Sequence, residues 1–134
     1  KPGTFDYLGL THYCGQSRSG NFLVCRSTSR KRLRAKLTAL NDWLKTVRNR
    51  AAVKEWWPTL KAKLMGHYRY YGVSGNIRRL QRYYWWATRL AYFWLNRRSQ
   101  KRSLNWAQFE RYLTRYPLPQ PKLYRNFYVA RAIP

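Results

Sequence analysis

The sequence predicts a mainly α-helical fold: a bundle of three long helices that follows an N-terminal β-hairpin and leads into a short fourth helix and an extended C-terminal tail. Apolar residues recur at helical spacing over three long segments, which is the main observation behind this prediction. A run of alternating residues precedes these segments, and a proline-rich segment follows them. With 134 residues, 45% of them hydrophobic, the chain can bury one modest core. We therefore expect a single compact domain with small appendages.

The first element expected is a β-hairpin over residues 5–26. Two β-prone runs, residues 5–10 and 21–25, flank a polar loop over residues 15–20. A lone hairpin is marginally stable in water, so it must pack on the helices or complete the sheet of a missing neighbour. Cys14 and Cys25 are too few for a disulfide framework and lack CxxC spacing, so we interpret them as partly buried thiols in a reducing cytosol.

A first helix is expected after Ser27, Thr28 and Ser29, whose side chains offer N-cap oxygens. Its apolar positions recur at helical spacing and are Leu33, Leu37, Leu40, Leu44 and Val47. A second stripe follows one flank of this apolar face and comprises Arg30, Arg34, Asn41, Lys45 and Arg48. This helix offers only Asp42 to balance its cations, whereas a solvated face usually carries both signs. We therefore interpret the stripe as a binding face.

The stretch from Gly66 to Leu80 predicts a hinge with a recognition surface, because glycines, tyrosines and arginines are concentrated there between two long helical patterns. A second helix should start near residues 53–55, provided that Pro58 lies in its first turn. Its apolar face comprises Trp56, Leu60, Leu64, His67 and Tyr71. We interpret His67 as a packed core histidine rather than a ligand or a base. Gly72 is expected to end the helix as a left-handed C-cap, and Gly66, Gly72 and Gly75 are the expected hinge residues.

A third helix is expected from Ile77 to about Arg98, with residues 74–76 as its cap. Its inward positions are Ile77, Leu80, Tyr84, Ala87, Ala91, Trp94 and Leu95. Another face interleaves cations with flat rings and comprises Arg78, Arg82, Trp85, Arg89 and Tyr92. Such a face can bind phosphates and stack on sugars or bases.

The remaining chain predicts a short basic loop, a fourth helix and an extended tail. Residues 97–102 form the basic loop, which we interpret as a phosphate contact. The fourth helix should begin near Asn105, with Trp106, Phe109, Leu113 and Tyr116 facing inward. Three prolines between residues 117 and 121 then end it and direct the chain into an extended segment.

The charge balance predicts a polyanionic partner. Lys and Arg number 28 against 4 Asp and Glu, a formal net charge of +24. Nucleic acid is the commonest partner for such a chain. A membrane surface is the less favoured alternative, because basic residues here are interleaved with Tyr and Trp instead of being confined to one polar face. The sequence contains no run of eighteen apolar residues, so it does not predict a membrane-spanning helix.

Catalytic and metal-binding patterns are missing from the sequence. The four carboxylates, Asp6, Asp42, Glu55 and Glu110, are spread over separate expected elements, so a paired-acid or two-metal site is not predicted. There is no Gly-rich phosphate loop, no HExxH and no zinc-type Cys/His spacing. We therefore expect no enzyme activity from this chain alone, and its opening residues suggest part of a longer protein.

Several blocks resemble the C-terminal part of bacterial group II intron reverse transcriptase/maturases. The resemblance rests on residues 3–11, 28–33 and 66–73 (GHYRYYGV), and on Trp106 with residues 115–119 (RYPLP). It covers nearly the whole chain up to about Pro121. It implies a hairpin over residues 1–27 that closes the palm of a missing polymerase domain, a thumb-like maturase domain over residues 28–100, and a short DNA-binding-like segment and tail over residues 101–134.

The resemblance also implies partners: structured intron RNA, a template–primer duplex, target DNA and the missing fingers and palm of the same protein, in the bacterial cytoplasm and without a membrane. The RNA or heteroduplex contacts that the resemblance implies are Arg30, Arg34, Arg69, Arg78, Arg79 and Arg82. The helical faces add Lys45 and Arg89 to these expected contacts. The expected DNA contacts are Lys101 and Arg102. No cofactor is expected in this chain. The Tyr-x-Asp-Asp motif of the palm is absent, so Mg²⁺ is expected only in the missing palm. The alternatives are a structural protein of a ribonucleoprotein and, less favoured, a cationic membrane-binding protein.

Overall fold

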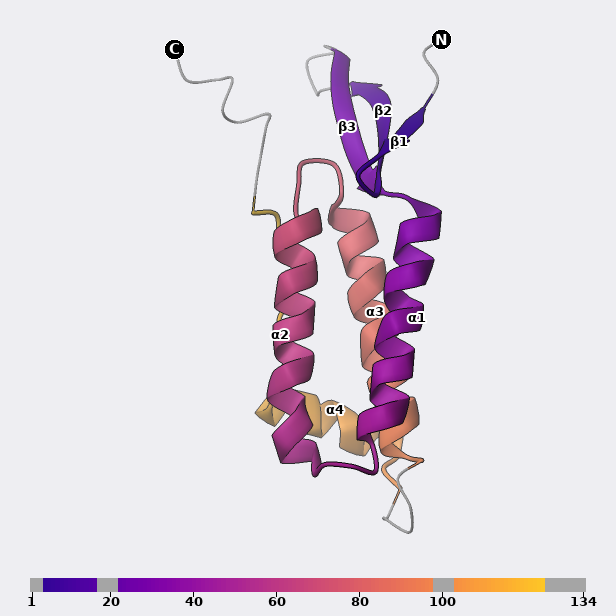
Figure 1. Ribbon diagram of the computed structural model, residues 1–134. Coiled ribbons are helices and arrows are strands. Elements are labelled where there is room, and N and C mark those ends of the chain that lie inside the picture. Colours follow the sequence, from indigo (N-terminus) through magenta and orange to yellow (C-terminus); the bar gives the residue numbers. More distant parts are fainter. Residues whose placement is uncertain (1–3, 17–21, 98–102, 125–134) are drawn as a thin grey trace.

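The computed structural model describes residues 4–16, 22–97 and 103–124, and its mainly α-helical architecture confirms the predicted fold class (Figure 1). Three long helices lie side by side, namely α1 (Arg30–Val47), α2 (Val53–Tyr71) and α3 (Ile77–Leu95). A small antiparallel sheet stands at one end of this bundle, and the short helix α4 (Trp106–Arg115) crosses the other end. Helices α1 and α3 both start at the sheet end, while α2 runs back towards it.

The sheet contains one strand more than the predicted hairpin. Its order is β1 (Phe5–Tyr7), β2 (Leu10–Gln16) and β3 (Phe22–Thr28), and both pairs are antiparallel. The β2–β3 pair forms a hairpin, but its first strand is Leu10–Gln16 and not the expected residues 5–10, of which residues 5–7 form β1 and pair with β2 instead. The first expected run is split by a two-residue turn at Leu8 (φ 54°) and Gly9 (φ 81°). Leucine rarely adopts a positive φ, so nothing in the local sequence predicted a turn at Leu8. The predicted state of Cys14 and Cys25 concerns side chains outside the described part of the structure.

The core forms where the apolar faces of the helices meet, and most of the predicted inward positions are confirmed. Its buried members are Leu33, Leu40, Leu44, Trp56, Trp57, Leu60, Leu64, Tyr68, Tyr71, Leu80, Tyr83, Ala87, Ala91, Leu95, Phe109 and Leu118. Tyr116 was expected to face inward, but α4 ends before it and its side chain is 45% exposed. Tyr92 was expected on the outer face of α3, yet it packs against Trp106 and Phe109 of α4 with ring centroids 5.0 and 5.3 Å away.

His67 is a packed core histidine, as predicted. Its side chain is buried, and its ring stacks on that of Tyr83 with centroids 3.7 Å apart and planes 4° from parallel. Burial, assisted by the positive charge of Lys36, lowers the pKa of His67 to about 3. The imidazole is therefore neutral at physiological pH.

The start of α2 agrees with the sequence, but Pro58 does not lie in the first turn. Val53 is the first residue of α2, so Pro58 falls in the second turn, inside the helix. A proline there removes one backbone hydrogen bond. The position is exposed, and water can satisfy the carbonyl that loses its partner.

The joint between α2 and α3 differs in detail from the predicted hinge. Gly66 lies inside α2 at an exposed position, so it is not part of the joint. Gly72 has φ −80° and ψ 62°, not the left-handed conformation expected of a C-cap. The Val73 N–H donates to the Tyr71 carbonyl at 2.9 Å, which makes this an inverse γ-turn. A Cβ at Gly72 would clash with the Tyr68 carbonyl oxygen. The glycine is thus required by close packing, whereas Gly75 has a positive φ of 90°.

The Asn76 side chain links the joint between α2 and α3 to Thr28, the last residue of β3. It is the N-cap residue of α3, but its side chain makes no capping bond. Instead, the carboxamide accepts from the Thr28 N–H at 2.6 Å and donates to the Thr28 hydroxyl at 2.8 Å and the Tyr71 carbonyl at 2.7 Å. Asn76 is fully buried. It therefore connects the end of β3, the end of α2 and the start of α3.

The segment after α4 returns along the bundle to the same joint (Figure 1). The Tyr68 hydroxyl donates to the Pro119 carbonyl at 2.9 Å, and Leu118 is buried. The Tyr124 N–H then donates to the Gly72 carbonyl at 2.8 Å. This extended segment covers the side of the core that α2 and α3 leave open.

Candidate nucleic-acid interface

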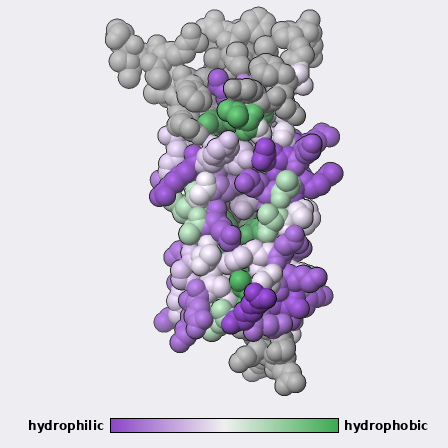
Figure 2. Space-filling view, viewed as in Figure 1, coloured by the Kyte–Doolittle hydropathy of each residue, from purple (hydrophilic) through white to green (hydrophobic). Residues whose placement is uncertain are grey.

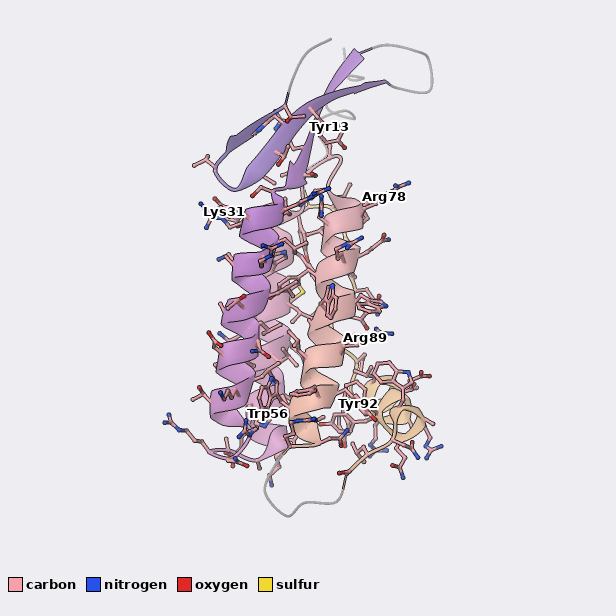
Figure 3. The ribbon with its side chains drawn as sticks, turned by 90° about the vertical axis from the view of Figure 1, so that its right-hand side faces the viewer. Tyr13, Lys31, Trp56, Arg78, Arg89 and Tyr92 are labelled. Carbon is pink, nitrogen blue, oxygen red and sulfur yellow. The ribbon has the colours of Figure 1, made fainter. Side chains whose placement is uncertain are left out.

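A cationic groove of about 840 Å³ runs between α1 and α3. Its arginines come from one turn of each helix near the sheet end, Arg30 and Arg34 from α1 and Arg78, Arg79 and Arg82 from α3. Further from the sheet, the lining changes to Thr38, Asn41, Trp86 and Leu90. Figure 3 views α1 and α3 side by side from this flank, with Arg78 labelled near the start of α3. We call this the α1/α3 groove.

The helix starts that carry these arginines are held in place by hydrogen bonds, of which the one between Thr28 and Asn76 is buried. The Ser29 hydroxyl caps α1 by accepting from the Arg32 N–H at 3.1 Å. The neighbouring Thr28 is bonded to Asn76, which directly precedes α3. The Tyr13 hydroxyl adds a bond from the sheet to the Gly75 carbonyl at 3.5 Å. The guanidinium groups of the two helices therefore start from backbone positions that are fixed relative to each other.

Electrostatics at this end of the bundle favour an anion. A helix N-terminus carries partial positive charge and normally attracts acidic residues to its first turn. Neither α1 nor α3 has an acidic residue in its first turn, and both have arginines there. Among the residues that the structure describes, no carboxylate lines the α1/α3 groove. The phosphates of a backbone bound along this groove would lie near the two helix N-termini and the five guanidinium groups.

Exposed aromatic rings lie beside this groove on α3. Trp86, which lines it, is 44% exposed, and the neighbouring Trp85 is 46% exposed. The Arg89 guanidinium carbon sits 3.5 Å from the Trp85 ring centroid and 5.1 Å from that of Trp106. Figure 3 labels Arg89 further along α3, towards α4. Flat rings next to guanidinium groups provide stacking surfaces for sugars or unpaired bases.

The structure brings together five of the predicted contacts and separates others. Arg30, Arg34, Arg78, Arg79 and Arg82 share the groove. Lys45 is exposed near the far end of α1, and Arg69 is exposed on α2, which does not line the groove. Arg89 is partly buried between α3 and α4. Lys101 and Arg102 lie outside the described residues. Arg48, part of the predicted stripe, is turned over the Trp94 ring at 4.6 Å.

Sequence reasoning missed two features of this surface. Trp86 lines the groove, and its position four residues after Arg82 on one helix face was the available signal. The cations Arg32, Lys36 and Lys63 line a second groove, between α1 and α2. Nothing in the local spacing placed these cations together, since they come from two helices.

The part of the chain that the structure describes contains no cluster of three or more His, Cys, Asp or Glu residues that could hold a metal ion. Within those same residues, no helix combines the length and apolar character needed to cross a bilayer.

Comparison with known proteins gave no match to a family model, a curated protein or a solved structure.

Proposed function

We propose that this chain is the RNA- and template–primer-binding thumb/maturase part of a group II intron reverse transcriptase, supporting intron splicing, reverse transcription and retrohoming. The observation that carries the binding part of this proposal is the convergence of five guanidinium groups from two helices on one groove. The resemblance of the GHYRYYGV and RYPLP blocks supports the family. Under this proposal the palm, with its aspartates and Mg²⁺, belongs to a missing part of the same protein.

The mechanism is binding. Each guanidinium can donate two parallel hydrogen bonds to a phosphate, and Trp85 and Trp86 can stack on sugars or unpaired bases beside it. Contacts of this kind recognise the shape and backbone of structured RNA more than its base edges. If each of the five arginines neutralises one phosphate, the α1/α3 groove alone gives a log–log salt slope of about −3.5 to −4.5.

Filter binding against salt tests this proposal, with structured intron RNA and anionic vesicles as rival ligands. The double variant Arg78→Ala with Arg82→Ala removes two groove cations and should weaken RNA binding roughly 25- to 60-fold in 0.1 M salt. A matched control, Arg50→Ala with Arg111→Ala, removes the same charge from exposed positions outside the groove and should change affinity far less.

Thermal unfolding checks that both variants are folded. All four arginines are exposed, so their loss should shift the melting temperature by no more than a few degrees. Preference for vesicles, a salt slope near zero, or normal RNA binding by the groove variant would overturn the proposal.

A further inference from the structure

The groove between α1 and α2 has cationic walls of its own. It has a volume of about 530 Å³ and is lined by Arg32 and Lys36 from α1 and by Lys63 and Tyr70 from α2, with His67 and Tyr83 among its deeper residues. None of the residues lining it is acidic. In Figure 2, which shows the face of the bundle formed by α1 and α2, hydrophilic side chains gather along both sides of a paler central strip. We call this the α1/α2 groove.

Helix α1 separates the two grooves. Its leucine face points into the core, and at 100° per residue Arg30 and Arg34 fall on one flank of that face, while Arg32 and Lys36 fall on the other. A helix with its side chains is about 10 Å across. One phosphate therefore cannot contact the cations on both flanks at the same time.

Cations from both helices line the α1/α2 groove, and no acidic residue is among its lining residues. Lys36 and Lys63 are both exposed, and the Lys63 ammonium lies 4.9 Å from the Trp43 ring centroid. An anion bound in the groove is attracted by the cations of both helices. The groove thus favours the same class of ligand as the α1/α3 groove.

Aromatic residues complete the α1/α2 groove. Tyr70 is 53% exposed at the groove, with its ring centroid 4.5 Å from that of Tyr71, and it can stack on a sugar or base. His67 is only 7% exposed, and its Nε2 is buried with no hydrogen-bond partner among the described residues. Its low pKa keeps it neutral, so the positive charge of this site comes from Arg32, Lys36 and Lys63.

We propose that the α1/α2 groove is a second phosphate site, which holds a nucleic-acid backbone segment other than the one in the α1/α3 groove. This inference rests on the proposed function, because it assumes that the polyanion is a nucleic acid. Arg32, Lys36 and Lys63 bind the phosphates, and Tyr70 stacks beside them. The bound nucleic acid therefore contacts α1 on two flanks, through two separate backbone segments.

The test uses the full chain and a structured RNA. The double variant Lys36→Ala with Lys63→Ala should weaken binding roughly 25- to 60-fold in 0.1 M salt and make the salt slope shallower by about 1.4 to 1.8. The charge-retaining variant Lys36→Arg with Lys63→Arg should bind like the wild type. The matched control, Lys54→Ala with Lys61→Ala, removes two exposed lysines of α2 that line neither groove and should have little effect.

Combining the variants tests whether the two sites are separate. The fold-losses in RNA affinity of Lys36→Ala/Lys63→Ala and of Arg78→Ala/Arg82→Ala should multiply if the two grooves hold different backbone segments. Suppose that Lys36→Ala/Lys63→Ala binds RNA like its control while Arg78→Ala/Arg82→Ala binds RNA weakly. The inference of a second phosphate site is then wrong, and the proposed function stands. If the four substitutions together cost no more than one pair, a single shared segment replaces the two-segment inference. If the wild-type chain does not bind RNA at all, both proposals fall.

Discussion

Replacing Asn76 by alanine should strongly destabilise the chain, because this one side chain joins segments that are far apart in the sequence. Its carboxamide makes three hydrogen bonds of 2.6 to 2.8 Å, two with Thr28 and one with the Tyr71 carbonyl. The residue is fully buried, and so is Thr28. Alanine removes all three bonds and leaves the Thr28 N–H and the Tyr71 carbonyl in the interior without this partner.

The expected magnitude follows from the groups that lose a hydrogen bond to Asn76. Each buried donor or acceptor that loses its partner costs about 1–3 kcal/mol. The Thr28 N–H loses its partner, whereas the Tyr71 carbonyl keeps the Val73 N–H at 2.9 Å and the Thr28 hydroxyl can turn to another acceptor, so we expect a loss of roughly 2–4 kcal/mol. A natural domain has about 5–15 kcal/mol of unfolding free energy in total. The Asn76→Ala chain should therefore be close to the limit of folding.

Equilibrium unfolding in urea, followed by circular dichroism, measures this loss. Gln81→Ala is the matched control, since it removes a carboxamide from an exposed position of α3 and should change the unfolding free energy by less than about 0.5 kcal/mol. Asn76→Asp keeps an acceptor for the Thr28 N–H but loses both donated bonds, so it should also destabilise. A loss below about 1 kcal/mol for Asn76→Ala would refute the reasoning, because it would mean that the buried groups find other partners at little cost.

Two further predictions concern α2 and the joint that follows it, one for His67 and one for the pair of glycines Gly72 and Gly66. His67 has a pKa of about 3 when folded, against an ordinary value of 6.5, so below pH 6.5 the unfolded chain binds a proton that the folded chain does not. The unfolding free energy should fall as the pH drops from 6.5 towards 3, by up to on the order of 5 kcal/mol, and His67→Phe should remove this dependence. Gly72→Ala should destabilise by about 1–3 kcal/mol, because the new Cβ clashes with the Tyr68 carbonyl and lies 3.1 Å from that of Lys122. Gly66→Ala should instead stabilise by about 0.5–1 kcal/mol, since its Cβ meets nothing within 4 Å inside a helix.

Urea unfolding at several pH values checks the first of these predictions, and unfolding at neutral pH checks the second. Parallel pH profiles for the wild type and His67→Phe would show that the histidine is protonated without cost in the folded chain. Equal stabilities of Gly72→Ala and Gly66→Ala would contradict the close packing of the extended segment against the joint.

The helices could be predicted because their signals are local. Ser29 before α1 and Asn105 before α4 both act as side-chain caps, and Asn105 forms a reciprocal capping box with Gln108. The apolar spacing of α1 and α2 also identified the buried faces, including that of His67. These features depend on residues within one or two turns of each other, which the sequence displays directly.

The joint between α2 and α3 could not be predicted in the same way. In the sequence Asn76 has the position and chemistry of a helix cap, but its side chain bonds to Thr28, 48 residues earlier in the chain. Gly72 has the position of a left-handed cap, yet the returning segment near Lys122 is what excludes a side chain there. Both residues respond to segments that are distant in sequence, and no local pattern reports such contacts.

By itself, the sequence determined which segments are helical, which face of each is apolar, and that the surface would be strongly cationic, because spacing and composition decide these properties. The tertiary structure alone decided which cations act together. Arg30 and Arg78 meet in one groove and Lys36 and Lys63 in another, while Lys45 lies in neither. The physical reason is that a groove belongs to two helices at once, so its charge depends on how α1 packs against α3 and α2 and not on the residues of any one helix.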